Sequence, residues 1–212
     1  MDPITASLQQ HYQRTFAEHG CTSAGVDWGT DDSVRRRNQA MLELIANALD
    51  RRKSPSLLDV GCGYANLLDQ ANDSKLELDY YGIDVVPEMT DAAASRHPNA
   101  AFRTLDAFDL VDDERYDYLV CNGILTQKLQ ASQLDMQAHA KRLIAHLYQH
   151  CRRGIAFNVM SSRVNFMADN LFYWSPIESL AFCVSELSSS VGLNHHYLPY
   201  EYTVYVYRPA EG

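Results

Sequence analysis

Residues 57–68 read Leu-Leu-Asp-Val-Gly-Cys-Gly-Tyr-Ala-Asn-Leu-Leu, an apolar run that passes through a glycine turn into an amphipathic stretch. Gly61 and Gly63 allow tight backbone geometry and close approach of a ligand, and the helix that follows presents free N–H groups. Asp59 places a carboxylate before the turn, where it would repel a phosphate and attract an ammonium or a sulfonium. A small molecule is therefore expected to lie across this turn.

Two further acids follow the next two apolar runs. Asp84 ends the run 80–84, about twenty-five residues after Asp59, where a carboxylate can accept hydrogen bonds from ribose hydroxyls. The alternative is that Asp84 caps the helix expected after Val85-Val86-Pro87. Asp106 follows the third run, and it can accept a hydrogen bond from an adenine amino group while a neighbouring apolar side chain covers the ring.

The elements that must position these residues alternate between strand and helix, which predicts a parallel sheet covered by helices on both faces. The expected strands are 56–60, 78–83, 101–105, 116–121 and 155–159, and the expected helices between and after them are 64–73, 87–96, 133–150 and 175–191. Before them we expect a helix at 4–19, a loop at 25–32 with Thr30 or an Asp as N-cap, and a helix at 32–52. The β-rich runs 195–199 and 201–207 predict a terminal antiparallel pair.

A dinucleotide-binding domain would use the same strand, turn and helix. Its fingerprint, however, requires Gly or Ala at the sixth place of G-x-G-x-x-G, and Asn66 stands there. The chain also lacks the length for the separate substrate domain of many dehydrogenases. An NAD-linked oxidoreductase is therefore disfavoured.

In combination, the segments over roughly residues 32–207 resemble the class I (Rossmann-like) S-adenosylmethionine-dependent methyltransferase family. Residues 59–63 are similar to its first motif, 82–84 to its second, 106–107 to its third, 116–123 to its fourth strand and 202–207 to its antiparallel last strand. The resemblance implies a seven-stranded, mostly parallel sheet in the order 3-2-1-4-5-7-6. It implies S-adenosylmethionine as cofactor, S-adenosylhomocysteine as product, and cofactor contacts from Asp59, Gly61, Gly63, Asp84, Val85, Asp106, Ala107 and Asn122.

Two positions depart from the family pattern. The third glycine of G-x-G-x-G is Ala65, a small residue with a slight expected effect on binding. The fourth strand ends in Cys121-Asn122-Gly123-Ile124 rather than the D/N-P-P-Y/F that accompanies methylation of amide or nucleobase nitrogens. The resemblance therefore points to methyl transfer onto an O, N, S or C nucleophile of a small-molecule acceptor, mainly by proximity and alignment.

The acceptor would approach under the N-terminal segment and the loops after strands four and five. Aromatic and cationic side chains in those regions are candidates for a lid or an acceptor wall, and each also has an alternative role in packing. These candidates are Tyr12, Trp28, Arg37, Arg163, Tyr173 and Trp174.

A general base is needed only if the nucleophile must lose a proton. The candidates are His195 and His196, at the start of the penultimate strand, and His139, in the helix before strand five. Since adjacent residues on a strand point to opposite faces, at most one of His195 and His196 can face the site.

Size, charge and cysteine content set the remaining limits. The chain has 212 residues, which favours one domain, 1–212, made of an N-terminal helix or lid (1–31) and a Rossmann-like core (32–212). A net charge of −9 disfavours a nucleic-acid partner, and we interpret the basic residues 35–37 and 51–53 as a solvated helix face. With no signal peptide and no membrane-spanning run, we expect a cytoplasmic protein. The five cysteines show no C-x-x-C pair, so neither disulfides nor a metal site is expected, and a homodimer stays open.

Two other classes also stay open. One is a cofactor-binding, non-catalytic Rossmann-like module that regulates or scaffolds a partner. The other is a methyltransferase for RNA or protein, which should reveal itself by a basic or extended groove.

Overall fold

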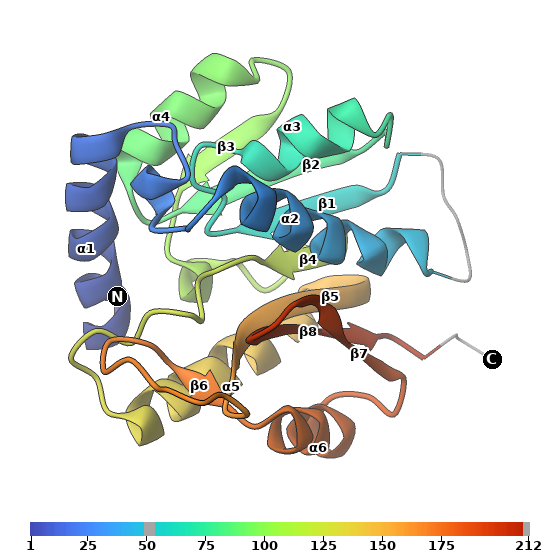
Figure 1. Cartoon of the computed structure of the whole chain (residues 1–212). Helices are drawn as coiled ribbons and strands as arrows, with labels where there is room; N and C mark the ends of the chain where they lie inside the picture. The colour runs from blue at the N-terminus through green and yellow to red at the C-terminus, as the bar shows by residue number, and fades with distance from the viewer. Residues whose placement is uncertain (49–53, 210–212) are drawn as a thin grey trace.

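The computed structural model describes residues 1–48 and 54–209, and these form one sheet flanked by helices (Figure 1). The sheet order is β3-β2-β1-β4-β5-β8-β7, and the short strand β6 pairs with β5 outside this path. The strands are β1 Ser56–Val60, β2 Asp79–Asp84, β3 Ala101–Thr104, β4 Tyr116–Cys121, β5 Cys151–Ser161, β6 Tyr173–Trp174, β7 Val191–Leu198 and β8 Glu201–Tyr207. The α-helices are α1 Pro3–His19, α2 Asp31–Ala46, α3 Asn66–Asp73, α4 Pro87–Arg96, α5 Gln133–Gln149 and α6 Pro176–Glu186, and two 3-10 turns are η1 Ala24–Val26 and η2 Ala107–Asp109.

The expected topology is confirmed. Strands β1 to β5 run parallel, while β8 is antiparallel to both β5 and β7. With β7 and β8 as sixth and seventh strands, the order is the expected 3-2-1-4-5-7-6. The two-residue strand β6, parallel to β5, is an addition that the sequence did not indicate.

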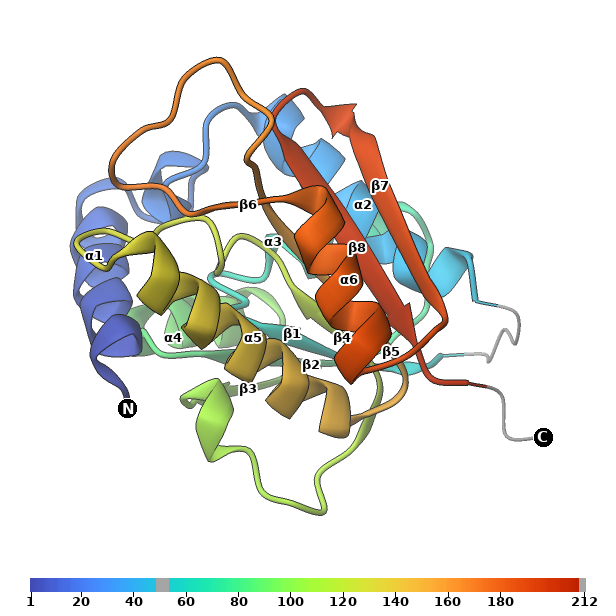
Figure 2. The ribbon, with the colours of Figure 1, turned by 90° about the horizontal axis from the view of Figure 1, so that it is seen from below.

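An apolar core covers each of the two faces of the sheet. On one face α5 and α6 pack through residues such as Met136 and Cys183, and on the other α2, α3 and α4 pack through residues such as Leu44 and Leu68. Figure 2 shows α5 and α6 together in front of the sheet, with α2 and α3 behind it. Helix α1 belongs to neither layer, because it stands at the end of the sheet where the parallel strands finish (Figure 1).

Several element boundaries differ from the expected ones. Helix α2 begins after Thr30, whose hydroxyl forms a capping box with Ser33, but it ends at Ala46, and residues 49–52 of the expected helix lie outside the described residues. Strand β5 begins at Cys151, four residues earlier than expected, because Tyr116 of β4 pairs with it there. Helix α6 ends at Glu186, since β7 begins at Val191 and needs the intervening residues for the turn.

Candidate functional site

A cavity at the carboxyl ends of the strands gathers most of the residues expected to hold a cofactor. Its wall includes Gly61, Gly63, Asp84, Val85, Asp106, Ala107 and Asn122, seven of the eight expected residues. Parallel strands bring these side chains together, because their carboxyl ends all lie at one edge of the sheet.

The turn after β1 is in the left-handed region at three places: Gly61 (φ 73°), Gly63 (φ 54°) and Ala65 (φ 64°). A Cβ on Gly61 would lie 2.1 Å from Cγ2 of Ile124, so the segment after β4 packs directly on the turn. Ala65 is the N-cap of α3 in a conformation that costs a non-glycine residue about 1 kcal/mol. Ala65 therefore has the small size that this turn needs, but unlike a glycine it cannot adopt the positive φ without strain.

The Asp84 carboxylate lines the cavity, and the capping role weighed as its alternative is not seen, because the N-cap of α4 is Val86 and no side chain caps this helix. Its Oδ2 accepts a hydrogen bond from Gly63 N at 2.9 Å, and its Oδ1 accepts one from Val86 N at 2.9 Å. Asp84 thus ties the end of β2 to the glycine turn. Each oxygen keeps capacity for a further hydrogen bond, which ribose hydroxyls can supply.

Asp106 presents an unused acceptor. Its Oδ1 accepts a bond from Phe108 N at 3.1 Å, while its Oδ2 is buried and has no hydrogen-bond partner. A buried carboxylate oxygen without a partner is costly, so this atom is suited to a ligand that donates to it. The wall beside it is formed by Ala107 and the ring of Phe108, which suit an apolar heterocycle. These residues therefore fit the adenine end of S-adenosylmethionine.

Asp59 does not line the cavity. Its Oδ2 accepts a bond from the Tyr80 hydroxyl at 2.5 Å on the opposite face of β1, and its Oδ1 is buried without a partner. Burial raises the pKa of the Asp59 carboxyl to about 7, although the Tyr80 hydrogen bond opposes this. The expectation of a carboxylate in direct contact with the ligand is not supported by this orientation.

The raised pKa of Asp59 predicts a dependence of stability on pH. Between pH 4 and pH 7 the folded state retains a proton that the unfolded state has lost, so the free energy of unfolding falls as the pH rises through this window. The side chain of Asp59→Asn stays neutral at every pH. The free energy of unfolding of this variant, relative to that of the wild type, should therefore rise by roughly 1–4 kcal/mol as the pH is raised from 4 to 8. Urea unfolding at both pH values measures this; equal pH slopes in the two proteins would contradict it.

Helix α1 closes the cavity as a lid. Thr5, Leu8 and Tyr12 line the wall, and burial together with the Asp27 carboxylate raises the pKa of the Tyr12 hydroxyl. Sequence reasoning found Tyr12 but missed Leu8, although the spacing of four residues between them indicates one helix face.

Hydrogen bonds hold this lid in place along its length. Gln9 Nε2 donates to Val85 O at 2.6 Å, Gln13 Nε2 donates to Glu88 at 2.9 Å, and Asp2 meets His139 Nδ1 at 3.0 Å. Two of these three contacts reach the loop and helix that follow β2.

Comparison with known proteins agrees with this geometry. A sequence model described as a methyltransferase domain matches residues 58–154. A protein of Mycobacterium tuberculosis, Rv1506c, which is named as a methyltransferase, is 37% identical over 153 residues that make up 71% of this chain and 92% of that protein. The chain belongs to the class I S-adenosylmethionine-dependent methyltransferases.

Solved structures share the fold of this methyltransferase. N-methyltransferase NodS from Bradyrhizobium japonicum matches with a TM-score of 0.68 and 14% identity, over 95% of this chain and 98% of that one. Magnesium protoporphyrin IX methyltransferase from Synechocystis matches with a TM-score of 0.66 and 14% identity, over 99% of both chains. The 1,6-didemethyltoxoflavin-N1-methyltransferase of Burkholderia thailandensis has a TM-score of 0.66 and 15% identity, over 96% of this chain and 88% of that one.

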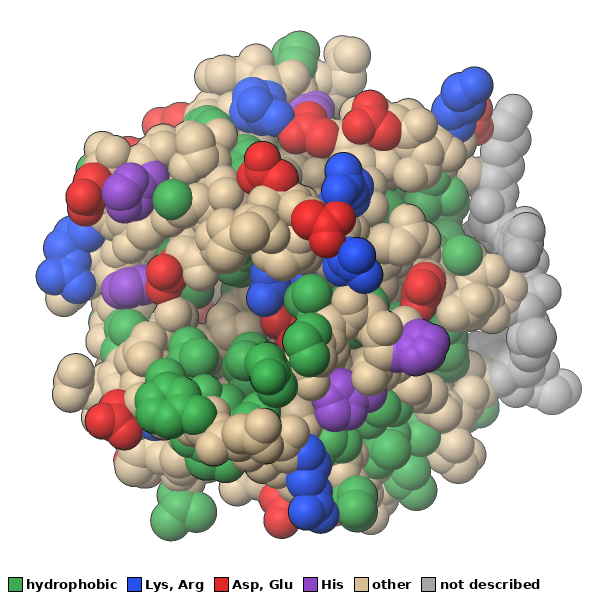
Figure 3. All heavy atoms as spheres, viewed as in Figure 1, with side chains coloured by type: hydrophobic (Ala, Val, Ile, Leu, Met, Phe, Trp, Pro, Cys, Tyr) green, Lys and Arg blue, Asp and Glu red, His purple; other side chains and the backbone are tan. Residues whose placement is uncertain are grey.

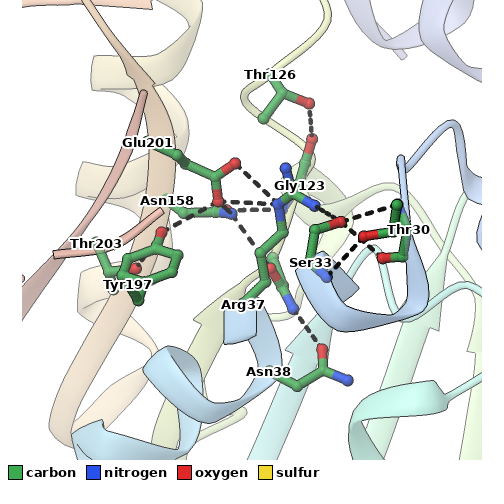
Figure 4. A network of polar contacts seen from close by, with 11 residues as sticks. Thr30, Ser33, Arg37, Asn38, Gly123, Thr126, Asn158, Tyr197, Glu201 and Thr203 are labelled. Carbon is green, nitrogen blue, oxygen red and sulfur yellow. Dashed lines mark hydrogen bonds and ion pairs between the residues drawn. The ribbon is translucent and has the colours of Figure 1, made fainter. Parts of the chain in front are cut away.

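A buried polar network lies beside the part of the methyltransferase cavity that is lined by Gly61, Asn122 and Gly123 (Figure 4). This part, at the ends of β1 and β4, is called the donor end. Asn122, in the cavity wall, donates to Asn38 at 2.9 Å and accepts from Asn158 at 3.3 Å. Asn158 also accepts from Gly123 N at 2.7 Å and donates to Glu201 at 2.5 Å. Sequence reasoning missed Glu201, because its signal is a single acid at the start of a β-rich run.

Arg37 belongs to this network rather than to an open anion site. Its Nε donates to both carboxylate oxygens of Glu201, at 3.0 and 2.8 Å, and its NH1 donates to Ser33 at 3.2 Å. Arg37, a candidate for a lid or an acceptor wall, does not line the cavity, and the buried carboxylate of Glu201 already satisfies its charge. Arg35 and Arg36, in contrast, pair with exposed Asp32 on a solvated face as expected.

Of the other acceptor candidates, one lines the cavity and three do not. Trp28 lines the cavity and packs over Gly123. Trp174 is a core residue, 1% exposed, between Phe172 and Phe182, so its expected place in an acceptor wall is wrong. Tyr173 accepts from Ala168 N within the loop that precedes β6, and Arg163 is exposed; neither lines the cavity.

The three histidine candidates do not meet at the donor end. His195 and His196 are exposed on β7 and lie outside the cavity wall, because this part of β7 sits at the edge of the sheet. His139 lines the cavity, but it contacts Phe108 at the adenine side and pairs with Asp2 of the lid. Burial lowers the pKa of His139, so near neutral pH it favours the uncharged form.

Residues 1–48 and 54–209, which the structure describes, show neither a metal centre nor a membrane span. In those ranges no group of three His, Cys, Asp or Glu side chains is placed to hold a metal ion. The helices within the same ranges include none that is long and apolar enough to cross a membrane.

Proposed function

We propose that this methyltransferase binds S-adenosylmethionine across the glycine turn and transfers its methyl group to a small-molecule acceptor. The observation that carries the proposal is the unpartnered Oδ2 of Asp106 in a cavity whose wall also includes Gly61, Gly63 and Asp84. A donor on the adenine ring would satisfy that oxygen, and hydroxyls of the ribose would complete the bonds of Asp84. When bound, the cofactor supplies a methyl group already activated by its sulfonium.

The protein's contribution is alignment and exclusion of water. The lid residues Leu8 and Tyr12 and the residues Val26 and Trp28 cover the cavity with largely apolar surface. Among the described residues no histidine reaches the donor end, which favours an acceptor atom that reacts without help from a histidine base.

A small-molecule acceptor is supported by two observations. The net charge of −9 opposes binding of a phosphate backbone. The structural neighbours include methyltransferases named for magnesium protoporphyrin IX and for 1,6-didemethyltoxoflavin, which are small molecules. We infer the same class of acceptor for this chain.

The first experiment tests the adenine contact by calorimetry. The wild type should bind S-adenosylhomocysteine roughly tenfold more tightly than S-inosylhomocysteine, because a keto oxygen cannot donate to Asp106 Oδ2, and it should not bind NAD. In Asp106→Asn the preference should shrink or reverse, since an amide N–H can donate to the keto group. Exposed Asp109, three residues away, provides the control: Asp109→Asn should keep the wild-type preference. Absence of adenosyl binding in the wild type, or an unchanged preference in Asp106→Asn, would contradict the proposal.

A further inference from the structure

The donor end of the cavity lies where the order of the sheet reverses. Strands β1 and β4 are neighbours at the centre of the sheet, and the chain leaves them toward opposite edges. Ligands of open parallel sheets bind at the carboxyl ends of such a pair. Gly61 follows β1 and Gly123 follows β4, and both line the cavity.

The indole of Trp28 lies directly on the backbone of Gly123. A Cβ built on Gly123 would lie 2.7, 2.8 and 3.0 Å from three indole atoms, and the φ of Gly123 is +90°. The guanidinium carbon of Arg37 stands 5.4 Å from the centroid of the indole ring. The indole of Trp28 therefore has two neighbours, the Gly123 peptide and the planar cation of Arg37, and the space that it occupies beside them is called the slot.

Both boundaries of this slot are fixed to the same buried carboxylate. Glu201 accepts from Arg37 at 2.8 Å, and it also accepts from Asn158, whose own Oδ1 holds Gly123 N at 2.7 Å. Figure 4 shows Glu201 and Asn158 beside Arg37 and Gly123, with dashed lines from Glu201 to Arg37 and from Asn158 to Gly123. The positions of Arg37 and Gly123 are thus tied to one hydrogen-bonded network.

Trp28, in contrast, comes from a loop. It lies between η1 and the start of α2, and its neighbours Asp27, Gly29 and Thr30 are exposed. Its backbone N–H donates to Ser23 O within the same loop. The space-filling view shows a hollow in this face of the molecule with apolar side chains gathered beside it (Figure 3). The loop is held by Asp27, which accepts from Gln127 at 2.6 Å, whereas among the described residues no hydrogen bond joins the indole itself to the sheet or to the network of Asn158 and Glu201.

We propose that the slot between Gly123 and Arg37 is the acceptor site, that Trp28 fills it in the absence of acceptor, and that the acceptor is a flat aromatic compound which takes the place of the indole. This inference rests on the proposed function, because it places the acceptor beside the donor end of the cofactor cavity. A flat ring matches both boundaries, since it packs against a peptide that has no side chain and stacks on a guanidinium. A saturated ring of the same skeleton is too thick for the same space.

The test uses the two tryptophans of the chain as reporters. The protein labelled with 5-fluorotryptophan gives one fluorine resonance from Trp28 and one from Trp174, and Trp28→Ala assigns them. Trp174 is 1% exposed in the core and serves as the internal reference. With S-adenosylhomocysteine at saturation, 2-naphthol should shift the Trp28 resonance and leave that of Trp174 in place. Decahydro-2-naphthol, which has the same skeleton and hydroxyl but is not flat, should bind at least tenfold more weakly.

Two variants sharpen the result. Trp28→Ala leaves the slot open, so calorimetry should show 2-naphthol binding several-fold more tightly than in the wild type. Phe166→Ala removes a ring that is 79% exposed on the loop after β5, and the affinity for 2-naphthol should not change. An unshifted Trp174 resonance in Trp28→Ala verifies that this variant is folded.

The outcomes separate this inference from the proposed function. If S-adenosylhomocysteine itself fails to bind, the proposed function is overturned. If it binds, but 2-naphthol leaves the Trp28 resonance unmoved, or binds no better than its saturated counterpart, or binds no more tightly to Trp28→Ala, the acceptor slot is overturned and the proposed function stands. A loss of 2-naphthol affinity in Phe166→Ala would also overturn it, because the ring would then bind the outer surface.

Discussion

Gly61→Ala should abolish binding of S-adenosylhomocysteine and lower the free energy of unfolding by about 2–4 kcal/mol. The new methyl group would lie 2.1 Å from Cγ2 of Ile124, and the residue would have to hold a φ of +73°. The strained conformation and the forced movement of Ile124 both act on the turn that the cofactor must cross. Calorimetric titration and urea unfolding measure the two effects.

Controls for this substitution are present in the same chain. Gly192 on β7 has its nearest neighbour at 3.6 Å and no positive φ, so Gly192→Ala should change stability by less than about 1 kcal/mol and leave binding intact. Adding Ile124→Ala to Gly61→Ala removes the clashing atom and should restore part of the stability. Normal binding by Gly61→Ala would show that the turn is not the cofactor surface.

Arg37→Leu should destabilise the fold by about 3–5 kcal/mol, because it leaves the buried carboxylate of Glu201 without its cation. The Glu201 side chain is only 2% exposed and takes two hydrogen bonds from Arg37. Arg36→Leu is the matched control on the next residue of the same helix. Its partner Asp32 is 53% exposed, so the loss should stay below about 1 kcal/mol.

The double variant Arg37→Leu with Glu201→Leu tests the reason for that loss. Removing both charges should recover most of the stability, since the cost comes from the unpaired charge rather than from the absence of the pair. Urea unfolding of the four proteins gives the comparison. Equal losses in Arg36→Leu and Arg37→Leu would show that burial of Glu201 does not govern the effect.

Local patterns were sufficient for the alternation of strands and helices and for the glycine turn, whereas the strand order came from the resemblance to the family. Each of Gly61, Asp84 and Asp106 follows an apolar run, and parallel strands must deliver their carboxyl ends to one edge. The common location of these residues at one edge of the sheet can therefore be predicted from the short-range hydrophobic periodicity of the sequence. The same reasoning placed α1, and of its two N-cap alternatives for α2, Thr30 or an Asp, the structure has Thr30.

Side-chain direction at single positions was harder to predict. Asp59 was expected at the ligand, but alternation along β1 turns it toward Tyr80 on the other face. Trp174 was expected in an acceptor wall, but the unpredicted strand β6 pairs with β5 and carries its ring into the core. In both cases the residue was correctly expected near the carboxyl end of a strand, but the face of the sheet toward which its side chain points was not predicted.

By itself the sequence determined the class of fold, the family and the edge of the sheet where the cavity lies. These follow from hydrophobic periodicity and from turn residues that lie within a few residues of one another. Only the tertiary structure decided what surrounds the donor end. Arg37 and Glu201 are 164 residues apart, and four strands, β1 to β4, lie between Trp28 and Gly123 in the sequence. Such pairs leave no local pattern, since they form when helices, loop and antiparallel strands close on one another and each buried charge must find a partner.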